Sequence, residues 1–411
     1  MALHILDEAN RCLQCKKPMC VQGCPIQTPI PAIVALLKEN RLDEAGKTLF
    51  ENNPLTTVCS LICNHEKQCE GHCFLNKKGA PVHFSAIENY ISSAYAPKMV
   101  KGPAKSNGHK VAIVGSGPAG LTIAIILARY GYQVTIFEGK DKIGGILRHG
   151  IPEFRLPKSV LDDLQYRHIE LKGIKIRPNI RIGDAIGIDD LFRDGYKAIF
   201  IGTGVWRPKV LHIKGESFGN VHFAINYLSN PNVYKLGERV TIIGAGNAAM
   251  DVARTAIRNG SRQVTCFTPE AKVAASDYEF NYAALEGVQF EYHLKPIEIL
   301  DDGVIFRQVK EAEDGTLQEI EGSDKVYPSD SVIIAISQGP RNVIVSTTSG
   351  LEANASGLLV ADEKGNTSRK GIFASGDVVN GARTVVEAVA HSKIVAESMH
   401  QYILEEYGPN A

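Results

Sequence analysis

Eight cysteines within the first 73 residues are the most concentrated source of chemistry in this 411-residue chain. They form two groups, with the spacings C-x2-C-x4-C-x3-C-P and C-x3-C-x5-C-x3-C. Compact loops of cysteine thiolates hold iron–sulfur clusters, and a final cysteine before proline is typical of two-cluster ferredoxins. The spacing therefore favours iron–sulfur clusters. The cysteines are Cys12, Cys15, Cys20 and Cys24, followed by Cys59, Cys63, Cys69 and Cys73.

Disulfide bonds and a zinc site are the competing interpretations of these cysteines. The N-terminal segment MALHILDEANRC lacks the apolar stretch of a secretory signal, so we expect a cytoplasmic, reducing environment where disulfides are rare. Structural zinc sites usually pair two C-x2-C knuckles, and this chain has one such pair. Iron–sulfur ligation is accordingly favoured over both.

Two glycine-rich turns supply a second kind of chemistry. The first, GSGPAG, lies between an apolar strand and an apolar helix, and an acidic residue ends the next strand. Glycines at these positions let the backbone approach a pyrophosphate at the helix N-terminus, while the acid accepts a hydrogen bond from a ribose hydroxyl. This pattern predicts a dinucleotide site formed by Gly115, Ser116, Gly117, Pro118, Ala119, Gly120 and Glu138.

The second turn, GAGNAA, has alanine at the third glycine position, which the dinucleotide fingerprint tolerates. Two such sites in one chain suggest a bound flavin and an exchangeable nicotinamide dinucleotide, with hydride exchanged between them. The residues of this second site are Gly244, Ala245, Gly246, Asn247, Ala248 and Ala249.

Residues near the C-terminus complete the candidate flavin site. Gly376 and Asp377 follow a late strand, where the carboxylate can lie near the ribityl–phosphate region of a flavin; capping of the next helix is the alternative. After Cys73 the chain has one further cysteine, Cys266, on an expected strand. The redox cysteine pair of flavin disulfide reductases is therefore missing, and we expect Cys266 to be buried and inert.

Hydrophobic periodicity indicates the elements that position these residues. A helical, cysteine-rich segment is followed by two strand–helix–strand units, which predicts an α/β fold. We expect helices at 31–52 and 84–94, the two units at 110–138 and 239–267, and further strands at 198–201, 304–307, 332–336 and 371–374.

The overall composition is that of a globular protein, with 44% hydrophobic and 22% charged residues. Lysine plus arginine equals aspartate plus glutamate, at 45 each, so nothing favours nucleic acid or an anionic membrane as a partner. No apolar run approaches the ~20 residues that a membrane-spanning helix needs.

With these motifs the chain resembles the small (beta) subunit of bacterial glutamate synthase. That family includes the N-terminal half of dihydropyrimidine dehydrogenase and the flavin subunit of ferredoxin-dependent transhydrogenases. The resemblance covers essentially the whole chain and includes both cysteine groups. It also rests on the segments VAIVGSGPAGL, GGILRHGIPEFRLPK, GAGNAAMDVART and FASGDVVNGARTVVEAV.

The resemblance implies an architecture of two Rossmann-like dinucleotide-binding domains, one inserted in the other, after an α-helical domain that binds two [4Fe-4S] clusters. The expected domains are 1–108 for the clusters, 109–235 with 339–411 for FAD, and 236–338 for NAD(P). It also extends the sites: the FAD site then includes Gly144, Gly145, Leu147, Arg155, Thr384, Val385 and Val386, and the nicotinamide site includes Asp251.

The family's ligand pattern assigns the clusters residue by residue. One cluster is held by Cys12, Cys15, Cys20 and Cys73, and the other by Cys24, Cys63, Cys69 and an oxygen ligand from Glu88. Cys59 is then present without being a ligand, and the choice between Glu88 and Cys59 as the eighth ligand stays open.

The chain departs from the family pattern after the second strand of the second unit. Many relatives carry a Tyr-Arg-Arg run there, whose arginines can pair with the 2′-phosphate of NADPH. Here the segment is CFTPEAK, in which both arginines are missing and Glu270 is nearby. An acid suits a free 2′-hydroxyl and repels a phosphate, so the family favours NADP(H) and the residues favour NAD(H).

The expected activity is NAD(P)H-dependent oxidoreduction through FAD and the two clusters, to or from a larger catalytic or electron-transfer subunit or a ferredoxin. A self-contained diaphorase without an obligate partner is the first alternative. A non-catalytic redox sensor that merely binds FAD is the second.

Overall fold

The computed structural model describes residues 4–99, 102–312 and 315–408 and divides into two compact units. The first contains the described parts of Met1–Arg148, Glu153–Val205 and Pro340–Ala411. The second contains those of His149–Pro152 and Trp206–Gly339. The second unit is therefore an insertion within the sequence of the first.

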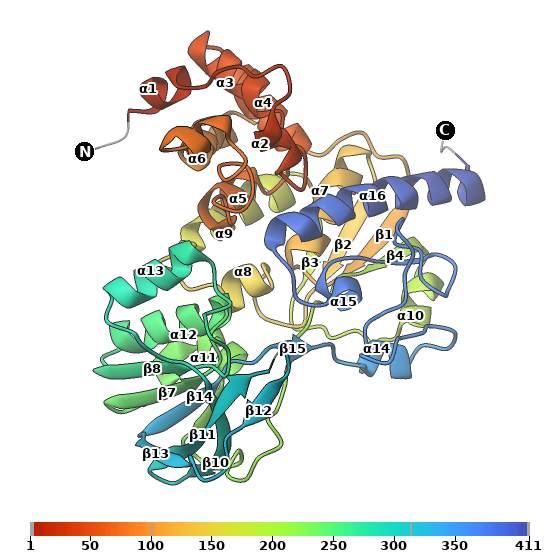
Figure 1. Ribbon diagram of the computed structural model, residues 1–411. Helices are drawn as coiled ribbons and strands as arrows, with labels where there is room; N and C mark the ends of the chain where they lie inside the picture. The colour runs from red at the N-terminus through yellow and green to blue at the C-terminus, as the bar shows by residue number, and fades with distance from the viewer. Residues whose placement is uncertain (1–3, 100–101, 313–314, 409–411) are drawn as a thin grey trace. The chain divides into compact units, whose positions relative to one another are not determined.

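A helical head forms the N-terminal part of the first unit (Figure 1). Its helices are α1 (Ile5–Asn10), α2 (Met19–Gln22), α3 (Ile30–Lys38), α4 (Leu42–Asn52), α5 (Thr56–Ile62) and α6 (Phe84–Tyr95), with short 3-10 helices η1 (Phe74–Lys78) and η2 (Ala96–Lys98). Ile33, Leu49 and Ile87, one from each of the three longest helices, are fully buried in a common core. This core supports the loops that carry the cysteines.

The expected helix at 31–52 is two helices in the structure. Asn40 has φ +59°, and the backbone N–H groups of Asn40 and Arg41 donate to the carbonyls of Leu37 and Leu36. A left-handed asparagine with this pair of hydrogen bonds is the Schellman motif that ends α-helices. The second expected helix, at 84–94, is confirmed as α6.

A five-stranded parallel sheet forms the centre of the first unit, in the order β16-β4-β1-β2-β3. Its strands are β1 (Lys110–Val114), β2 (Gln133–Phe137), β3 (Lys175–Arg177), β4 (Tyr196–Ile201) and β16 (Ile372–Ala374). The central strands are nearly continuous apolar runs because helices cover both faces of such sheets. The helices are α7 (Pro118–Arg129), α8 (Ile146–His149), α9 (Lys158–Leu164), η3 (Gln165–Glu170), α10 (Ile188–Arg193), α14 (Val343–Ser346), α15 (Asp377–Asn380) and α16 (Val385–Tyr407).

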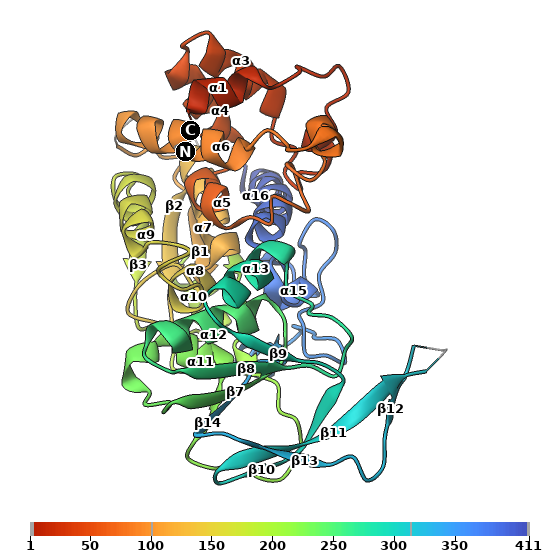
Figure 2. The same cartoon turned by 60° about the vertical axis from the view of Figure 1, so that its left-hand side comes forward.

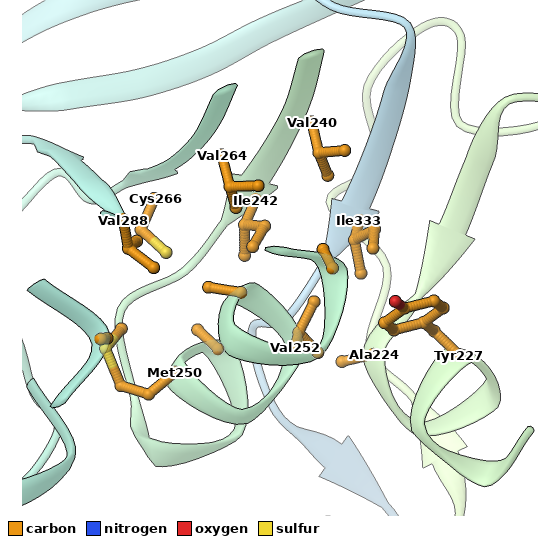
Figure 3. Packing of buried hydrophobic residues seen from close by; sticks show 14 of the residues in the cluster. Ala224, Tyr227, Val240, Ile242, Met250, Val252, Val264, Cys266, Val288 and Ile333 are labelled. Atoms are coloured by element: carbon orange, nitrogen blue, oxygen red, sulfur yellow. The ribbon is translucent and has the colours of Figure 1, made fainter. Parts of the chain in front are cut away.

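A second five-stranded parallel sheet, in the order β6-β14-β7-β8-β9, forms the centre of the second unit. It consists of β6 (Val221–Phe223), β7 (Arg239–Ile243), β8 (Gln263–Phe267), β9 (Gln289–Glu291) and β14 (Ser331–Ile334), with α11 (Ala224–Ser229), η4 (Pro231–Val233), α12 (Asn247–Arg258) and α13 (Asp277–Leu285). Figure 3 shows Val252 of α12 packed toward Ile242 and Val264 of the sheet. Cys266 lies in this core with no exposed surface, which confirms its expected burial.

Antiparallel strands complete the second unit (Figure 2). They are β10 (Leu294–Leu300), β11 (Gly303–Glu311), β12 (Leu317–Glu319) and β13 (Lys325–Pro328), with a separate pair formed by β5 (Arg207–Pro208) and β15 (Gln338–Gly339). The expected strand at 304–307 belongs to β11, so it is part of this antiparallel sheet rather than of a parallel one.

The expected fold class is confirmed, because two parallel α/β sheets follow a helical head. The boundary expected at residue 235 differs from the structure, where residues 206–235 lie in the second unit. The reason is that β6 pairs with β14 and α11 packs on α12. Among the described residues no helix has the length and apolar character needed to cross a membrane.

Candidate cluster and dinucleotide sites

Five of the eight cysteines line a cavity in the head. The cavity has a volume of about 200 Å³, and its wall includes Cys12, Cys15, Cys20 and Cys73, together with Cys69, which the family pattern assigns to the other cluster. Apolar side chains such as Ile30 and Phe84 form much of the rest. The structure therefore brings together the four thiols that the family pattern assigns to one cluster.

The electrostatics of these thiols fit an iron–sulfur cluster. The pKa of Cys20 is raised to about 11, mainly by burial and in part by the nearby thiols of Cys73, Cys12 and Cys15, whose thiolates would repel its own. Four thiolates in one apolar cavity need positive charge to neutralise them, which iron supplies. The donor set and the cavity thus match a thiolate-held cluster.

The residues expected to hold the second cluster come from several parts of the head, including Cys63 directly after α5 and Glu88 on α6. Burial and the neighbouring charges of Glu70, Glu88 and Cys24 raise the pKa of Cys69. The pKa of Cys63 is also raised, first by a hydrogen bond with Cys59 and then by burial. Cys69 thus lies near Cys24 and Glu88, and Cys63 lies near Cys59, Cys69 and Glu88.

Glu88 is buried, with 6% of its surface exposed. Burial raises its pKa to about 7, although the Thr56 hydroxyl donates to Oε1 at 2.6 Å and lowers the pKa in part. A buried carboxylate among thiols needs compensation by a cation. Glu88 is thus placed as an oxygen ligand would be, although Cys59 is also within reach of Cys63.

Two unsatisfied polar atoms lie in the loop that carries Cys63 and Cys69. His65 Nε2 and Asn64 Oδ1 are buried and have no hydrogen-bond partner. Buried polar atoms are normally hydrogen-bonded. A protonated His65 Nε2 can donate to a cluster sulfide, whereas Asn64 Oδ1 can only accept. No three His, Cys, Asp or Glu side chains within the described ranges are arranged for a single metal ion. A four-iron cluster does not require that arrangement, because each thiolate binds a separate iron.

The first glycine-rich turn connects β1 to α7. At Gly115, with φ +98°, an added Cβ would lie 2.7 Å from the Gly202 carbonyl oxygen, and at Gly120 one would lie 2.0 Å from the Gly115 carbonyl oxygen. By contrast, a Cβ at Gly117 would meet no atom closer than 4.0 Å. The open space at Gly117 is where a pyrophosphate can approach the backbone.

Glu138, at the end of β2, holds this turn in place. Its Oε2 accepts from the Ser116 backbone N–H at 3.0 Å and from the Ser116 hydroxyl, and its Oε1 accepts from the Lys140 N–H at 2.8 Å. A carboxylate has about four acceptor sites, so it can still accept from a ribose. The link from Ser116 to Glu138 was not anticipated from the sequence.

The segment GGILRHG packs onto the same turn. The Gly144 N–H donates to the Ser116 carbonyl and to its hydroxyl, each at 3.1 Å. A Cβ at Gly145 would lie 2.7 Å from the Gly117 Cα, so only glycine fits there. Leu147 is fully buried, and Arg155 lies further along the chain. The structure thus brings Gly144 and Gly145 to the predicted dinucleotide turn.

The C-terminal motif reaches the turn from β16. A Cβ at Gly376 would lie 3.0 Å from the Ala119 Cβ, which places Gly376 beside the start of α7. Burial raises the pKa of Asp377 to about 6. Asp377 does not cap the long helix α16, since Thr384 does so through a capping box with Glu387. Val385 and Val386 begin that helix.

One segment of this site was missed in the sequence. Gly202 and Thr203 follow β4 and abut Gly115, and the Gly202 N–H donates to the Val114 carbonyl at 2.9 Å. The sequence did contain a signal for this segment, because Gly202 directly follows the apolar strand β4. The carboxyl end of β4 lies at the same edge of the sheet as that of β1. Ligands in open α/β sheets bind at such edges.

The second glycine-rich turn connects β7 to α12 in the second unit. A Cβ at Gly244 would lie 2.5 Å from the Ala335 carbonyl oxygen, whereas Gly246 has no atom within 4 Å. Asn247 Oδ1 accepts from the Ser276 N–H at 2.8 Å, and Asp251 is buried on α12. Ala248 and Ala249 complete the first turn of this helix. The geometry repeats that of the first turn, with a crowded first glycine and an open second one.

Sequence comparison identifies two regions. The pyridine nucleotide-disulphide oxidoreductase family matches residues 109–392, and the 4Fe-4S cluster family of dihydropyrimidine dehydrogenase domain II matches residues 2–99. The chain is 32% identical to the glutamate synthase [NADPH] small chain of Escherichia coli (strain K12), over 96% of this chain and 91% of the relative. It is 31% identical to the NAD-dependent dihydropyrimidine dehydrogenase subunit PreT of Salmonella typhimurium, over 98% and 95%.

Solved structures share the fold at lower sequence identity. Mycobacterium tuberculosis FprA in complex with NADPH matches with a TM-score of 0.62 and 17% identity, over 74% of this chain and 87% of FprA. T. acidophilum thioredoxin reductase matches with a TM-score of 0.55 and 22% identity, over 71% and 97%.

Fold and sites together define an NAD(P)H-dependent flavin oxidoreductase with an iron–sulfur domain. The chain belongs to the pyridine nucleotide-disulphide oxidoreductase family, in the group that contains the glutamate synthase small chain and PreT. Its cofactors are FAD, two [4Fe-4S] clusters and a nicotinamide dinucleotide.

Proposed function

We propose that this chain is the electron-transfer subunit of a larger complex. FAD and the nicotinamide supply hydride transfer, and the clusters supply one-electron steps to or from a partner subunit. The observation that carries the proposal is that one expected ligand set lies beside the flavin-binding part of the first unit, while the other includes the exposed Cys15 at the surface of the head.

The group of Cys24, Cys63, Cys69 and Glu88 is the one on the flavin side. Helix α5, which precedes Cys63, contacts α9 of the flavin-binding part. We assign these four residues to the second cluster, and Cys12, Cys15, Cys20 and Cys73 to the first. The family pattern supports the assignment, and so does the grouping of the side chains.

The first cluster is the one from which a partner can take electrons. Cys15 is exposed, and so are the apolar side chains of Leu13, Met19 and Phe74, at 55%, 48% and 49% of their surface. Lys17 lies on the rim of the same cavity. Exposed apolar side chains rimmed by charge are typical of protein interaction sites.

The chain's own residues prepare the nucleotide sites for this role. Gly115, Gly117 and Gly120 let a pyrophosphate approach the start of α7, and Glu138 fixes the turn while it offers acceptors to a ribose. Gly144, Gly376 and Asp377 border the same turn, and we assign Leu147, Arg155, Thr384, Val385 and Val386 to the same site. We assign Gly244, Ala245, Gly246, Asn247, Ala248, Ala249 and Asp251 to the nicotinamide dinucleotide.

Purification of the native complex tests this function. We expect a larger subunit to co-purify and the anaerobic addition of NADH or NADPH to bleach first the flavin absorbance and then the broad cluster absorbance. A chain that purifies alone and turns over with flavin acceptors at full rate would instead be a diaphorase. A chain whose flavin is not bleached by either nucleotide would be a sensor.

Glu270 gives a test of nucleotide choice. It is exposed and follows the carboxyl end of β8, where the second unit is expected to bind the ribose of the dinucleotide. Glu270→Arg replaces a carboxylate that repels a 2′-phosphate by a side chain that pairs with it. We expect the ratio of kcat/KM for NADPH to that for NADH to rise on the order of tenfold. Steady-state kinetics with an artificial acceptor measures it.

The matched control for this prediction is Glu238→Arg. Glu238 is also exposed, at 68%, but it precedes β7 and so lies at the amino end of the strands, opposite the expected nucleotide. The same charge change there is expected to leave the NADPH to NADH ratio unchanged. An equal rise of the NADPH to NADH ratio in both variants would show that Glu270 does not contact the ribose.

A further inference from the structure

The helical head meets the flavin-binding part of the first unit at the end of α4. Arg129, the last residue of α7, donates Nη2 to the Phe50 carbonyl at 3.0 Å, and the Phe50 ring stacks on His168 with a centroid distance of 5.1 Å. Lys393 of α16 donates Nζ to Asn52 Oδ1 at 2.9 Å. Three contacts thus fix the end of α4, and two of them come from the cationic side chains of Arg129 and Lys393.

The contact from Lys393 continues to a cluster-ligand thiol. Asn52 Nδ2 donates to Thr28 Oγ1 at 3.2 Å, and Thr28 Oγ1 lies 3.3 Å from Cys24 Sγ. Thr28 is only 3% exposed, so water does not compete strongly for its hydroxyl. A continuous hydrogen-bonded path therefore joins α16 to Cys24. We call Lys393, Asn52 and Thr28 the relay.

The chemistry of its members fixes the direction of the relay. An ammonium has only donors, so Asn52 must turn its oxygen to Lys393 and its amide nitrogen to Thr28. Thr28 Oγ1 then accepts from Asn52 and has its own hydrogen free for Cys24. A thiolate bound to iron can only accept. Every donor in the relay consequently points toward the sulfur, and aligned hydrogen bonds strengthen one another.

We propose that Lys393, acting through Asn52 and Thr28, raises the reduction potential of the cluster that Cys24 binds. Reduction adds negative charge to a cluster, and hydrogen bonds to its sulfurs together with a nearby cation stabilise that charge. Lys393 is thereby a positioning residue on the electron path, and it comes from the flavin-binding part rather than from the head. The inference rests on the proposed ligand role of Cys24.

The surroundings of Lys393 agree with this role. Burial lowers the pKa of Lys393, while the charge of Cys24 raises it, which places the two groups within electrostatic reach. Helix α16 also packs along α7, whose first turn is the predicted FAD turn. One helix therefore contacts both the helix of the flavin site and the relay to the second cluster.

An EPR-monitored redox titration of the intact protein, with a europium(II) chelate as reductant, tests the relay. We expect Lys393→Met to lower the equilibrium constant for reducing the second cluster about tenfold, which is ~59 mV for a one-electron couple. Thr28→Val keeps the shape of the side chain but removes the final donor, and it is also expected to lower the reduction potential of the second cluster. Lys393→Arg is expected to keep most of the wild-type potential.

Two controls separate the relay from other effects. Lys370→Met removes a cation that pairs with Glu406 near the far end of α16. It changes the net charge by the same amount as Lys393→Met, and the potential of the second cluster is expected to stay unchanged. The potential of the first cluster serves as an internal standard for folding. An unchanged second-cluster potential in Lys393→Met or in Thr28→Val, or an equal shift in Lys370→Met, would overturn the proposal.

A further variant separates failure of the relay from failure of the ligand assignment. Cys24→Ala is expected to remove one cluster, seen as loss of about half of the bound iron. Alanine has no atom that can bind iron, so if both clusters survive in Cys24→Ala, the ligand assignment is wrong and the relay with it. If one cluster is lost while Lys393→Met has the wild-type potential, the assignment stands and the relay alone is wrong.

Discussion

Gly120→Ala is expected to yield a protein that purifies with little or no FAD. The third glycine of the first turn lies on α7, where a Cβ would stand 2.0 Å from the Gly115 carbonyl oxygen. That oxygen belongs to the backbone and cannot rotate away, so α7 must move relative to the turn that receives the pyrophosphate. Overpacking of this kind costs up to about 3 kcal/mol, which corresponds to roughly a hundredfold loss of FAD affinity.

The FAD-to-protein ratio of the purified variant, measured from its absorbance, checks this result, and circular dichroism reports the fold. Gly187→Ala is the matched control. Gly187 precedes α10 with φ −93°, and a Cβ there would meet only Asp190 Oδ2 at an ordinary 3.6 Å. The control is expected to retain FAD. Full FAD occupancy in Gly120→Ala would show that the first turn does not hold the pyrophosphate.

The strands around the dinucleotide turns could be predicted from the sequence almost residue by residue. Lys110–Val114 and Gln263–Phe267 are strands with the expected bounds, because short apolar runs before glycines carry the information locally. The helix break at Asn40 was missed, since an asparagine that ends a helix differs from any other only in its φ. The boundary near residue 235 was missed because β6 is short and half-buried. Its place in the second sheet depends on pairing with β14, more than a hundred residues away.

The candidate cluster site could be predicted from the sequence only in part. Spacing alone indicated that the cysteines bind metal, but the assignment of each cysteine to one of two clusters came from the family resemblance. The burial of Glu88 had a local signal that was not used: Phe84, Ile87 and Ile91 mark the buried face of α6, and Glu88 falls on that stripe. The relay from Lys393 had no such signal, because its members come from distant parts of the sequence and only the folded chain joins them.

Cys20→Ala is expected to lose the first cluster and with it electron transfer to the partner, while reduction of the flavin by NAD(P)H persists. Cys20 lines the same cavity as Cys12, Cys15 and Cys73, and burial and these neighbours keep its thiol from ionising without a metal. With one of four ligands missing, the remaining thiolates no longer complete the cluster. We expect roughly half of the iron to be lost and the rate to the partner to fall by orders of magnitude.

The matched control for this prediction is Cys59→Ala. Cys59 is buried beside Cys63 but is not assigned to either cluster, so its loss is expected to leave the iron content and the partner rate unchanged. Iron analysis and anaerobic stopped-flow measurement of flavin reduction distinguish the two variants. If Cys20→Ala keeps all its iron, the first ligand set is wrong; if Cys59→Ala loses half, Cys59 rather than Glu88 is the eighth ligand. If Cys20→Ala loses its cluster but still transfers electrons to the partner at the wild-type rate, the electrons leave from the flavin, and the proposed path through the head is wrong.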